Sequence, residues 1–318
     1  MNGYPVLVAT EYEDPTADLV ITELNRRRAP VLRFDPGRDF PDSCVLTARL
    51  SPDGWGGQLR VGERTAELGS IRSLYHRRPS SYTPNRDDQT ARFMAQENRR
   101  GLGGVLSSLP GCLYLSHPQA IARAEYKPAQ LAAAMKVGFS VPTTLITSDP
   151  AEAKSFASEQ PTIYKPMHAG AYDIEGEPAG IWASSVDPDE VDNAVRHCAH
   201  LFQAQVPKDF DVRAVVVGEQ VFCAQITAPP GVLDWRAEYR NLTYEPIRCP
   251  DGMRRTLVRF LARFGLSFGA FDFAVTTDGT WWFLECNPNG QWAWLEDAAG
   301  LPITAAIADL LENGESNA

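Results

Sequence analysis

The sequence has none of the segments that would anchor the protein in a membrane or export it. Its 318 residues include no long apolar run, whereas a membrane-spanning helix needs about 18 or more consecutive apolar residues. The N-terminal segment MNGYPVLVATEY lacks the basic start and the cleavage site of a signal peptide. We therefore expect a cytoplasmic protein with no membrane partner.

Cysteine is sparse and unpatterned, and positive charge is in deficit. None of the six cysteines forms a Cys-x-x-Cys pair, which is the spacing typical of zinc sites and redox motifs, so reduced thiols fit better than disulfides. Lys and Arg number 30 against 40 Asp and Glu, which gives a formal net charge of −10. Because nucleic acids attract basic proteins, we expect no nucleic-acid partner.

Two glycine-rich nucleotide-binding motifs are also absent. No GxGxxG follows the first expected strand, so nothing supports a dinucleotide-binding fold, and no GxxxxGK[ST] loop is present. The hydrophobic content of 44% is that of a globular protein. The chain is long enough for two or three small domains.

A pair of strands late in the chain carries the most specific signal. Residues 269–294, GAFDFAVTTDGTWWFLECNPNGQWAW, indicate two strands around Asp278-Gly279, a strong sign of a two-residue hairpin turn. Such a turn fixes the register and places Asp272 directly opposite Glu285. The other face is expected to carry core side chains, namely Phe271, Phe273, Val275, Trp282, Leu284 and Cys286.

The facing carboxylates predict a cation site. Like charges directly across a strand pair repel one another unless a positive charge lies between them. Asn287 follows Glu285 on the same side and adds a third oxygen ligand, and Mg²⁺ prefers such an all-oxygen set. The alternative is that Asp272 and Glu285 are solvated on an exposed face of a sheet, where charged residues are common.

The N-terminal part has an α/β pattern and an arginine pair. Its first elements are expected to be a strand, a helix and a strand, over 4–9, 18–28 and 31–34. A strand over 71–75 leads to Arg77 and Arg78. These could hold a carboxylate or phosphate by forked hydrogen bonds, or they could be an ordinary surface pair. A helix is expected over 87–107.

The middle of the chain brings two lysines, one at a helix start and one at a strand end. Pro128 favours a helix that begins at Lys127. The strand TIYK ends on Lys165, and a charge there is unusual unless it points at an anion. Residues 168–180 are small and glycine-rich, so we expect a flap between strands. We also expect a helix over 189–200.

A second hairpin is expected over 210–227. Asp211 and Arg213 lie two residues apart on its first strand and therefore share one face. The loop that follows brings Asp234 together with Arg236. Lysines stabilise transferred phosphates as point charges, and the carboxylate-amide trio would hold Mg²⁺ between phosphate oxygens. These are the parts that phosphoryl transfer from ATP requires.

The order and content of these parts resemble the ATP-grasp superfamily. The segment FQAQVPKDFDVRAVVVGEQVFCAQI is similar to its hinge and phosphate-binding arginine strand, and GAFDFAVTTDGTWWFLECNPNGQWAW to its metal-binding end. VPKDFDVR, LDWR, NPNGQWAWLE and GLPITAAIADLL are similar to one branch, the graspetide synthetases. That branch installs ω-ester or ω-amide cross-links in ribosomal precursor peptides, as in microviridins. HRRP in the first domain also suits this branch.

The resemblance implies an α/β (α+β) protein with the ATP-grasp fold. Residues 1–118 would form an N-terminal α/β pre-ATP-grasp domain, 119–200 a central α/β subdomain, and 201–318 a C-terminal antiparallel-sheet subdomain with the metal site. ATP would bind between the last two. The Trp-rich C-terminal region and the resemblance are compatible with a homodimer.

The resemblance also implies a role for individual residues. The predicted ligands of Mg²⁺, in a site for two ions, are Asp272, Glu285 and Asn287. Phosphates of ATP would be contacted by Lys127, Lys165 and Arg213, with Asp211 beside Arg213 to orient the incoming group. The hinge that reads the adenine edge would be Gln203, Ala204, Gln205 and Val206, and Asp209 would reach the ribose. Ala204 departs from the family, where an acidic residue is usual, and Cys286 stands where an aliphatic residue is normal.

The implied activity is that of an ADP-forming ligase. It would activate an Asp or Glu side chain of a precursor peptide, made of leader and core, as an acyl phosphate. A Ser or Thr hydroxyl or a Lys amine of the same peptide would then attack. One alternative is an ATP-grasp ligase that joins an amino acid or small amine to a carboxylate, and another is a nucleotide-binding regulatory protein without turnover.

Overall fold

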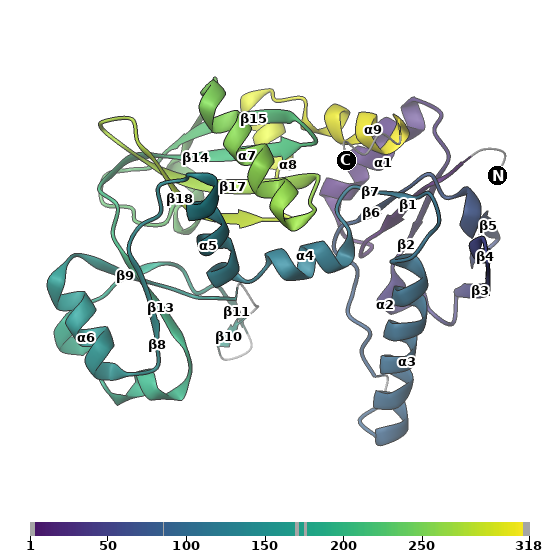
Figure 1. Cartoon of the computed structure of the whole chain (residues 1–318), viewed down its shortest axis with the longest axis horizontal. Helices are drawn as coiled ribbons and strands as arrows, with labels where there is room; N and C mark the ends of the chain where they lie inside the picture. The colour runs from purple at the N-terminus through teal and green to yellow at the C-terminus, as the bar shows by residue number, and fades with distance from the viewer. Residues whose placement is uncertain (1–3, 85, 169–171, 175–176, 314–318) are drawn as a thin grey trace.

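The computed structural model describes residues 4–84, 86–168, 172–174 and 177–313 (Figure 1). The N-terminal part begins with a parallel sheet in the order β2-β1-β6-β7. Its strands are β1 (Val6–Ala9), β2 (Val31–Phe34), β6 (Ser73–His76) and β7 (Leu113–Tyr114). The expected strand-helix-strand opening is confirmed. Helix α1 (Pro15–Arg26) begins earlier than expected because the Asp14 side chain caps it by accepting from the N–H of Ala17.

A three-stranded antiparallel sheet and a long helix complete this part. The sheet contains β3 (Cys44–Ser51), β4 (Gly54–Val61) and β5 (Arg64–Glu67), with short helices α2 (Pro36–Asp39) before it and η1 (Leu68–Ser70) after it. The helix expected over 87–107 is confirmed as α3 (Gln89–Leu106). Leu102 and Leu106 of α3 pack into one core with Leu74 of β6.

Two helices connect the halves of the molecule, α4 (Pro118–Ala124) and α5 (Lys127–Val137) (Figure 1). The His117 side chain caps α4 by accepting from the N–H of Gln119. Helix α5 begins at Lys127, as expected, and ends at Gly138, whose φ of +97° lies in the left-handed region that glycine favours. In the described ranges, no helix has both the length and the apolar character needed to cross a membrane.

The central part is built on an antiparallel sheet in the order β12-β9-β13-β8. Its strands are β8 (Thr144–Thr147), β9 (Thr162–Lys165), β12 (Ser184–Ser185) and β13 (His200–Ala204), covered by α6 (Pro150–Glu159). The segment expected to be a flap contains a small hairpin of β10 (Tyr172–Ile174) and β11 (Glu177–Ala179). The expectation for residues 169–171 and 175–176 lies outside the described residues.

The expectation of a helix over 189–200 is wrong. The segment forms two short 3₁₀ turns, η2 (Pro188–Glu190) and η3 (Asn193–His197), before β13 begins. The side chains of Asp187 and Asp192 each accept a bond from the N–H two residues on, at 2.9 and 2.8 Å. Aspartates that bond to nearby backbone in this way favour turns over a continuous helix.

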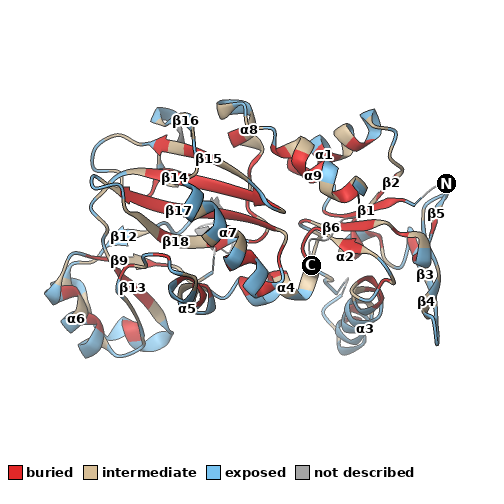
Figure 2. Ribbon diagram, turned by 45° about the horizontal axis from the view of Figure 1, so that its top comes forward, coloured by how far each residue is buried: buried red, intermediate tan, exposed pale blue. Residues whose placement is uncertain are grey.

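The C-terminal part is a five-stranded antiparallel sheet in the order β16-β15-β14-β17-β18. Its strands are β14 (Lys208–Val217), β15 (Gln220–Thr227), β16 (Thr243–Ile247), β17 (Phe268–Thr276) and β18 (Trp281–Asn287). Its helices are η4 (Trp235–Ala237), η5 (Tyr239–Asn241), α7 (Asp251–Phe264), α8 (Ala293–Ala299) and α9 (Ile303–Asn313). The central strands β14 and β17 are the most buried (Figure 2).

Helices cover the core faces of this sheet from two directions. Helices α5 and α7 pack on the side of Phe271 and Phe273. Helix α9 packs on Val215 and Val217 of β14 and also lies against α1 (Figure 1). The C-terminal helix therefore shares a core with the first strands of the chain.

The register predicted for the late hairpin is confirmed at its open end and wrong towards the turn. Asp272 pairs with Glu285, as expected, but Phe273 pairs with Phe283, so Leu284 is an extra residue. This β-bulge puts Phe283 in the core, where Trp282 and Leu284 were expected. The difference in register arises at the turn, which spans residues 277–280, whereas the prediction assumed a turn of two residues.

Candidate active site

A buried ion pair lies at the centre of the five-stranded sheet. Arg213 of β14 pairs in register with Asp272 of β17, and Asp272 pairs in turn with Glu285 of β18. Arg213 Nη1 donates to both carboxylate oxygens of Asp272, at 2.8 and 2.7 Å. Its Nη2 donates to the carbonyl of Gln291 at 2.9 Å. Three neighbouring strands thus place three charged side chains in a row.

Two cations hold the carboxylate of Glu285. Lys127 donates to Oε2, and Arg236 Nη1 donates to Oε1 at 3.2 Å. Burial raises the pKa of Glu285, but Lys127, Lys165 and Arg236 outweigh burial and hold that pKa well below its ordinary value. The carboxylate is therefore charged throughout the physiological pH range.

Gln130 fixes the position of Lys127 relative to the sheet. Its side-chain amide accepts from the N–H of Cys286 at 2.8 Å and donates to the carbonyl of the same residue at 2.7 Å. It also donates to the carbonyl of Ala124 at 2.6 Å. Because Gln130 is one turn of α5 after Lys127, these bonds attach the helix start to β18 beside Glu285.

Lys165 lies opposite the carboxylates. A small cavity of about 60 Å³ is lined by Lys165, Asp211, Asp272 and Glu285, among others. Leu284, the residue added by the bulge, also lines it. Lys165 is only 7% exposed, and burial lowers the pKa of its ammonium group. A desolvated lysine therefore faces this cavity, and its role in binding an anion stays a prediction.

Asp211 lies beside Arg213 on β14, on the same face. Lys208 Nζ donates to Asp211 Oδ2 at 2.5 Å and to the carbonyl of Leu233 at 2.8 Å. Burial raises the pKa of Asp211 to about 6 against the opposing charge of Lys208. This carboxyl therefore titrates close to neutral pH.

Of the four residues predicted to form the hinge, two lie in the central sheet and two line a cavity. Gln203 and Ala204 end β13, and Gln203 is buried there with its Nε2 donating to Thr144 Oγ1 at 2.9 Å. Gln205 and Val206 line a cavity of about 260 Å³. Asp209 is exposed at a bulge of β14 and lines the same cavity.

The loop after β18 connects the site to the N-terminal part. Asn287 is exposed, and its Oδ1 accepts from the N–H of Asn289 at 3.0 Å. Arg77 donates to the carbonyl of Asn289 and to Gln291 Oε1, the latter at 2.7 Å. Arg77 is thus buried and holds this loop by two hydrogen bonds. Arg78 is exposed and lines a cavity of about 550 Å³ together with Asn287.

Sequence reasoning assigned no role to Arg236, Asp234, Lys208 or Gln130. Arg236 pairs with Asp234 at 2.8 Å and reaches Glu285. The sequence contains the motif LDWR, but this motif lies in a loop. A loop has no periodicity from which the contact of Arg236 with β18 could be predicted. Gln130 carries no local signal, because an amide on a helix is ordinary.

The chain matches no protein-family model and no curated protein. Among solved structures it is similar to the macrocyclase MdnB from Microcystis aeruginosa MRC, with 30% identity and a TM-score of 0.79 over 96% of this chain and 98% of that chain. It is also similar to the macrocyclase MdnC from the same organism, bound with the precursor peptide MdnA, with 28% identity and a TM-score of 0.84 over 98% and 100%.

A third match concerns the fold. The Chryseobacterium gregarium RiPP-associated ATP-grasp ligase, in complex with ADP and a leader and core peptide, has a TM-score of 0.87 at 24% identity over 98% of this chain and 97% of that chain. The α/β fold of this chain, with its parallel and antiparallel sheets, is that of an ATP-grasp ligase. The chain belongs to the RiPP-associated ATP-grasp macrocyclases, the graspetide synthetase branch that its sequence resembles.

Proposed function

We propose that the protein is an ATP-dependent macrocyclase that joins Asp or Glu side chains of a ribosomally made precursor peptide to Ser or Thr hydroxyls or Lys amines of the same peptide. The observation that carries the proposal is the row Arg213–Asp272–Glu285, of which the first two are buried. Lys127 and Lys165 face this row. Such a site suits a polyphosphate and a divalent cation. MdnC, a relative with 28% identity, is bound with its precursor peptide.

The carboxylates fit the proposed Mg²⁺ site in charge and in donor type. Asp272 and Glu285 line one cavity, and Glu285 and Asn287 line the next, so Glu285 lies where the two meet. All three offer oxygen, as Mg²⁺ requires, and we propose them as its ligands for two ions. When bound, Mg²⁺ would neutralise charge on the phosphate oxygens.

Three cationic side chains of the site fit the polyphosphate of ATP. Each of them bonds to a carboxylate that we propose as a ligand of Mg²⁺. Lys127 and Arg236 bond to Glu285, and Arg213 bonds to Asp272. If these carboxylates bind metal, the three cations are free to bind phosphate oxygens. Arg213 Nε is buried without a hydrogen-bond partner among the described residues, so it offers a further donor.

We propose that ATP binds between the central and C-terminal parts. Lys127 and Lys165 would contact its phosphates, residues 203–206 its adenine edge, and Asp209 its ribose. The domain limits that we propose are 1–118, 119–200 and 201–318. Strand β13 (His200–Ala204) pairs into the central sheet, so the proposed hinge would begin at the end of that strand.

The proposed chemistry has two steps. In the first, the peptide carboxylate attacks the γ-phosphorus of ATP, and the bond to the leaving oxygen of ADP breaks. In the second, a hydroxyl or amine of the peptide attacks the acyl carbon, the bond from carbon to the phosphate oxygen breaks, and phosphate leaves. Arg213 and the lysines stabilise the negative charge that develops on phosphate oxygens.

We propose Asp211 as the group that orients the attacking hydroxyl or amine and accepts its proton. It is adjacent to Arg213 on one strand face, and burial raises its pKa to about 6. A base with that pKa is deprotonated at neutral pH yet basic enough to take a proton.

Mass spectrometry of a co-expressed precursor peptide tests the proposal. Each internal cross-link removes one water, whereas ligation of a free amino acid or amine, the alternative function, adds a residue. Asp272→Asn and Glu285→Gln should abolish the change of mass. A peptide that keeps its mass with ATP and Mg²⁺ present would contradict macrocyclisation.

A cytoplasmic location is part of the proposal. All six cysteines are free, and Cys44, Cys223 and Cys286 are buried, with the thiol of Cys223 beside that of Cys249. Free buried thiols fit the reducing environment in which ATP is available. Fractionation of cells that express the protein would test this assignment.

A further inference from the structure

A cavity of about 660 Å³ in the N-terminal part lies between α3, α4 and the end of β6. It is distinct from the cavity of about 550 Å³ beside Glu285, but the two share four lining residues. These residues are His76, Pro79, Pro118 and Ala122. The two cavities therefore adjoin at these residues, and we call the pair, which extends from the active site to α3, the groove.

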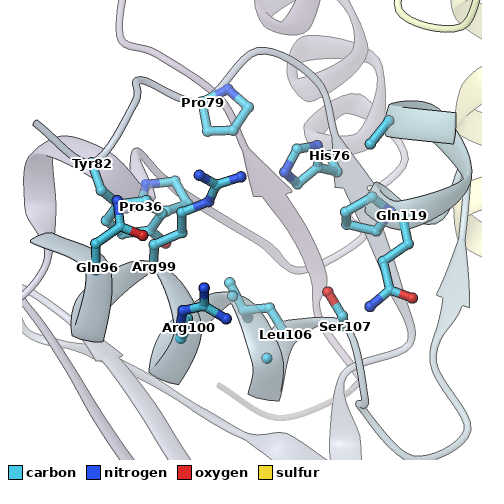
Figure 3. Close-up of a pocket in the computed structure, with 14 residues that line it drawn as sticks. Pro36, His76, Pro79, Tyr82, Gln96, Arg99, Arg100, Leu106, Ser107 and Gln119 are labelled. Atoms are coloured by element: carbon cyan, nitrogen blue, oxygen red, sulfur yellow. The ribbon is translucent and has the colours of Figure 1, made fainter. Parts of the chain in front are cut away.

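The groove is positively charged along α3. Arg99 and Arg100 line it (Figure 3), and no hydrogen bond or ion pair holds either guanidinium in the part of the chain that the structure describes. No Asp or Glu lines this cavity, and burial lowers the pKa of His76 to about 4, so the imidazole is neutral. A protein with a net charge of −10 thus presents an acid-free cavity with two free cations.

Glycines of α3 keep the groove open. Gly103 and Gly104 line the cavity, and a Cβ added at either would meet nothing within 4 Å. Neither has a positive φ, so neither the backbone nor the packing requires glycine. Glycine in a helix interior is unfavourable. Its effect at these two positions is to leave room where a ligand can approach the helix.

We infer that this groove binds an acidic stretch of the peptide being cross-linked, with Arg99 and Arg100 holding carboxylates that are not being activated. The inference rests on the proposed function, because a substrate for several cross-links must carry several Asp or Glu side chains. Arginine binds carboxylates by forked, charge-assisted hydrogen bonds. Arg78, which lines the cavity beside Glu285, would guide the next carboxylate towards the site.

The test uses fluorescence anisotropy with a fluorescein-labelled peptide of twelve residues that alternates Thr and Glu. We expect this peptide to bind the full-length protein and the matching Thr-Gln peptide to bind much more weakly. The double variant Arg99→Gln/Arg100→Gln should weaken binding of the Thr-Glu peptide about tenfold or more, because it removes two charge-assisted contacts.

Gly104→Leu and Gly101→Leu form a matched pair on the same helix. Both positions are exposed, and leucine is the better helix former at each, so both variants should melt no lower than the wild type. Only Gly104 lines the groove. Gly104→Leu should weaken peptide binding about as much as the arginine variant, whereas Gly101→Leu should leave the affinity within about twofold.

Calorimetry with ADP and Mg²⁺, run on the same proteins, separates failure of the inference from failure of the proposed function. If no variant and no wild-type protein binds ADP, the proposed function fails. If ADP binds but the Thr-Glu peptide does not, or binds equally to Arg99→Gln/Arg100→Gln and Gly104→Leu, the inference is overturned. Equal binding of the Thr-Gln peptide, or binding of inorganic phosphate in place of the peptide, would overturn it as well.

Discussion

Replacement of Gly290 by alanine should disable the site while leaving the rest of the molecule folded. A Cβ at this position would lie 2.4 Å from the Cβ of Ala270, 2.9 Å from Arg213 Nη2 and 3.2 Å from the Cβ of Asn287. The contact with Ala270 involves a short side chain on a buried strand, which cannot swing away. The loop must therefore move, and Arg213 loses its bond to the carbonyl of Gln291.

The magnitude follows from the cost of overpacking. Inserting one methyl group into a packed site costs about 1–3 kcal/mol, and Gly290→Ala should lower the melting temperature by a few degrees. Gly279→Ala is the matched control. Gly279 has a φ of +81° in the turn of the late hairpin, and a Cβ there meets nothing within 4 Å. Its backbone strain should cost about 1–2 kcal/mol far from the site.

Differential scanning fluorimetry and ADP release in the presence of precursor peptide measure the two effects. Gly279→Ala should lose stability and keep its kcat/KM, whereas Gly290→Ala should lose stability and most of its kcat/KM. If Gly290→Ala melts and turns over like the wild type, the close approach of this loop to Arg213 is not needed and the reasoning is refuted.

The remaining predictions concern three side chains. Gln130→Leu leaves the buried N–H of Cys286 without its acceptor, so it should cost about 1–3 kcal/mol in chemical denaturation; an unchanged midpoint would contradict this. The pKa of Asp211, about 6, predicts that kcat/KM falls below that pH, and Asp211→Asn should lower turnover and remove the acid limb. Because the native state binds the proton more tightly than the unfolded chain, stability should also fall as pH rises from about 4 to 6. Glu285→Gln should abolish ADP release at every Mg²⁺ concentration, and a variant that releases ADP like the wild type as Mg²⁺ is titrated would exclude Glu285 as a ligand.

Short sequence signals predicted many of the helices and strands. Helix α5 begins at Lys127, as Pro128 indicates, and β14 and β15 form the hairpin expected over 210–227. The resemblance to graspetide synthetases, read from motifs, is confirmed by relatives with 28% and 30% identity. In contrast, the prediction of a helix over 189–200 was wrong. Aspartate side chains there bond to nearby backbone N–H groups and so favour turns, and a pattern of helical spacing does not take these bonds into account.

By itself, the sequence determined that β17 and β18 form a hairpin around Asp278-Gly279, because turn signals are short-range. The predicted pairing of Asp272 with Glu285 is present, but it depends on the bulge at Leu284, which offsets the one-residue shift that the longer turn introduces. Only the tertiary structure decided what surrounds them. The bulge at Leu284, the reach of Arg236 to Glu285 and the groove beneath α3 depend on where separately formed elements come to lie. No periodicity encodes such placements, since they result from packing between residues that are far apart in the chain.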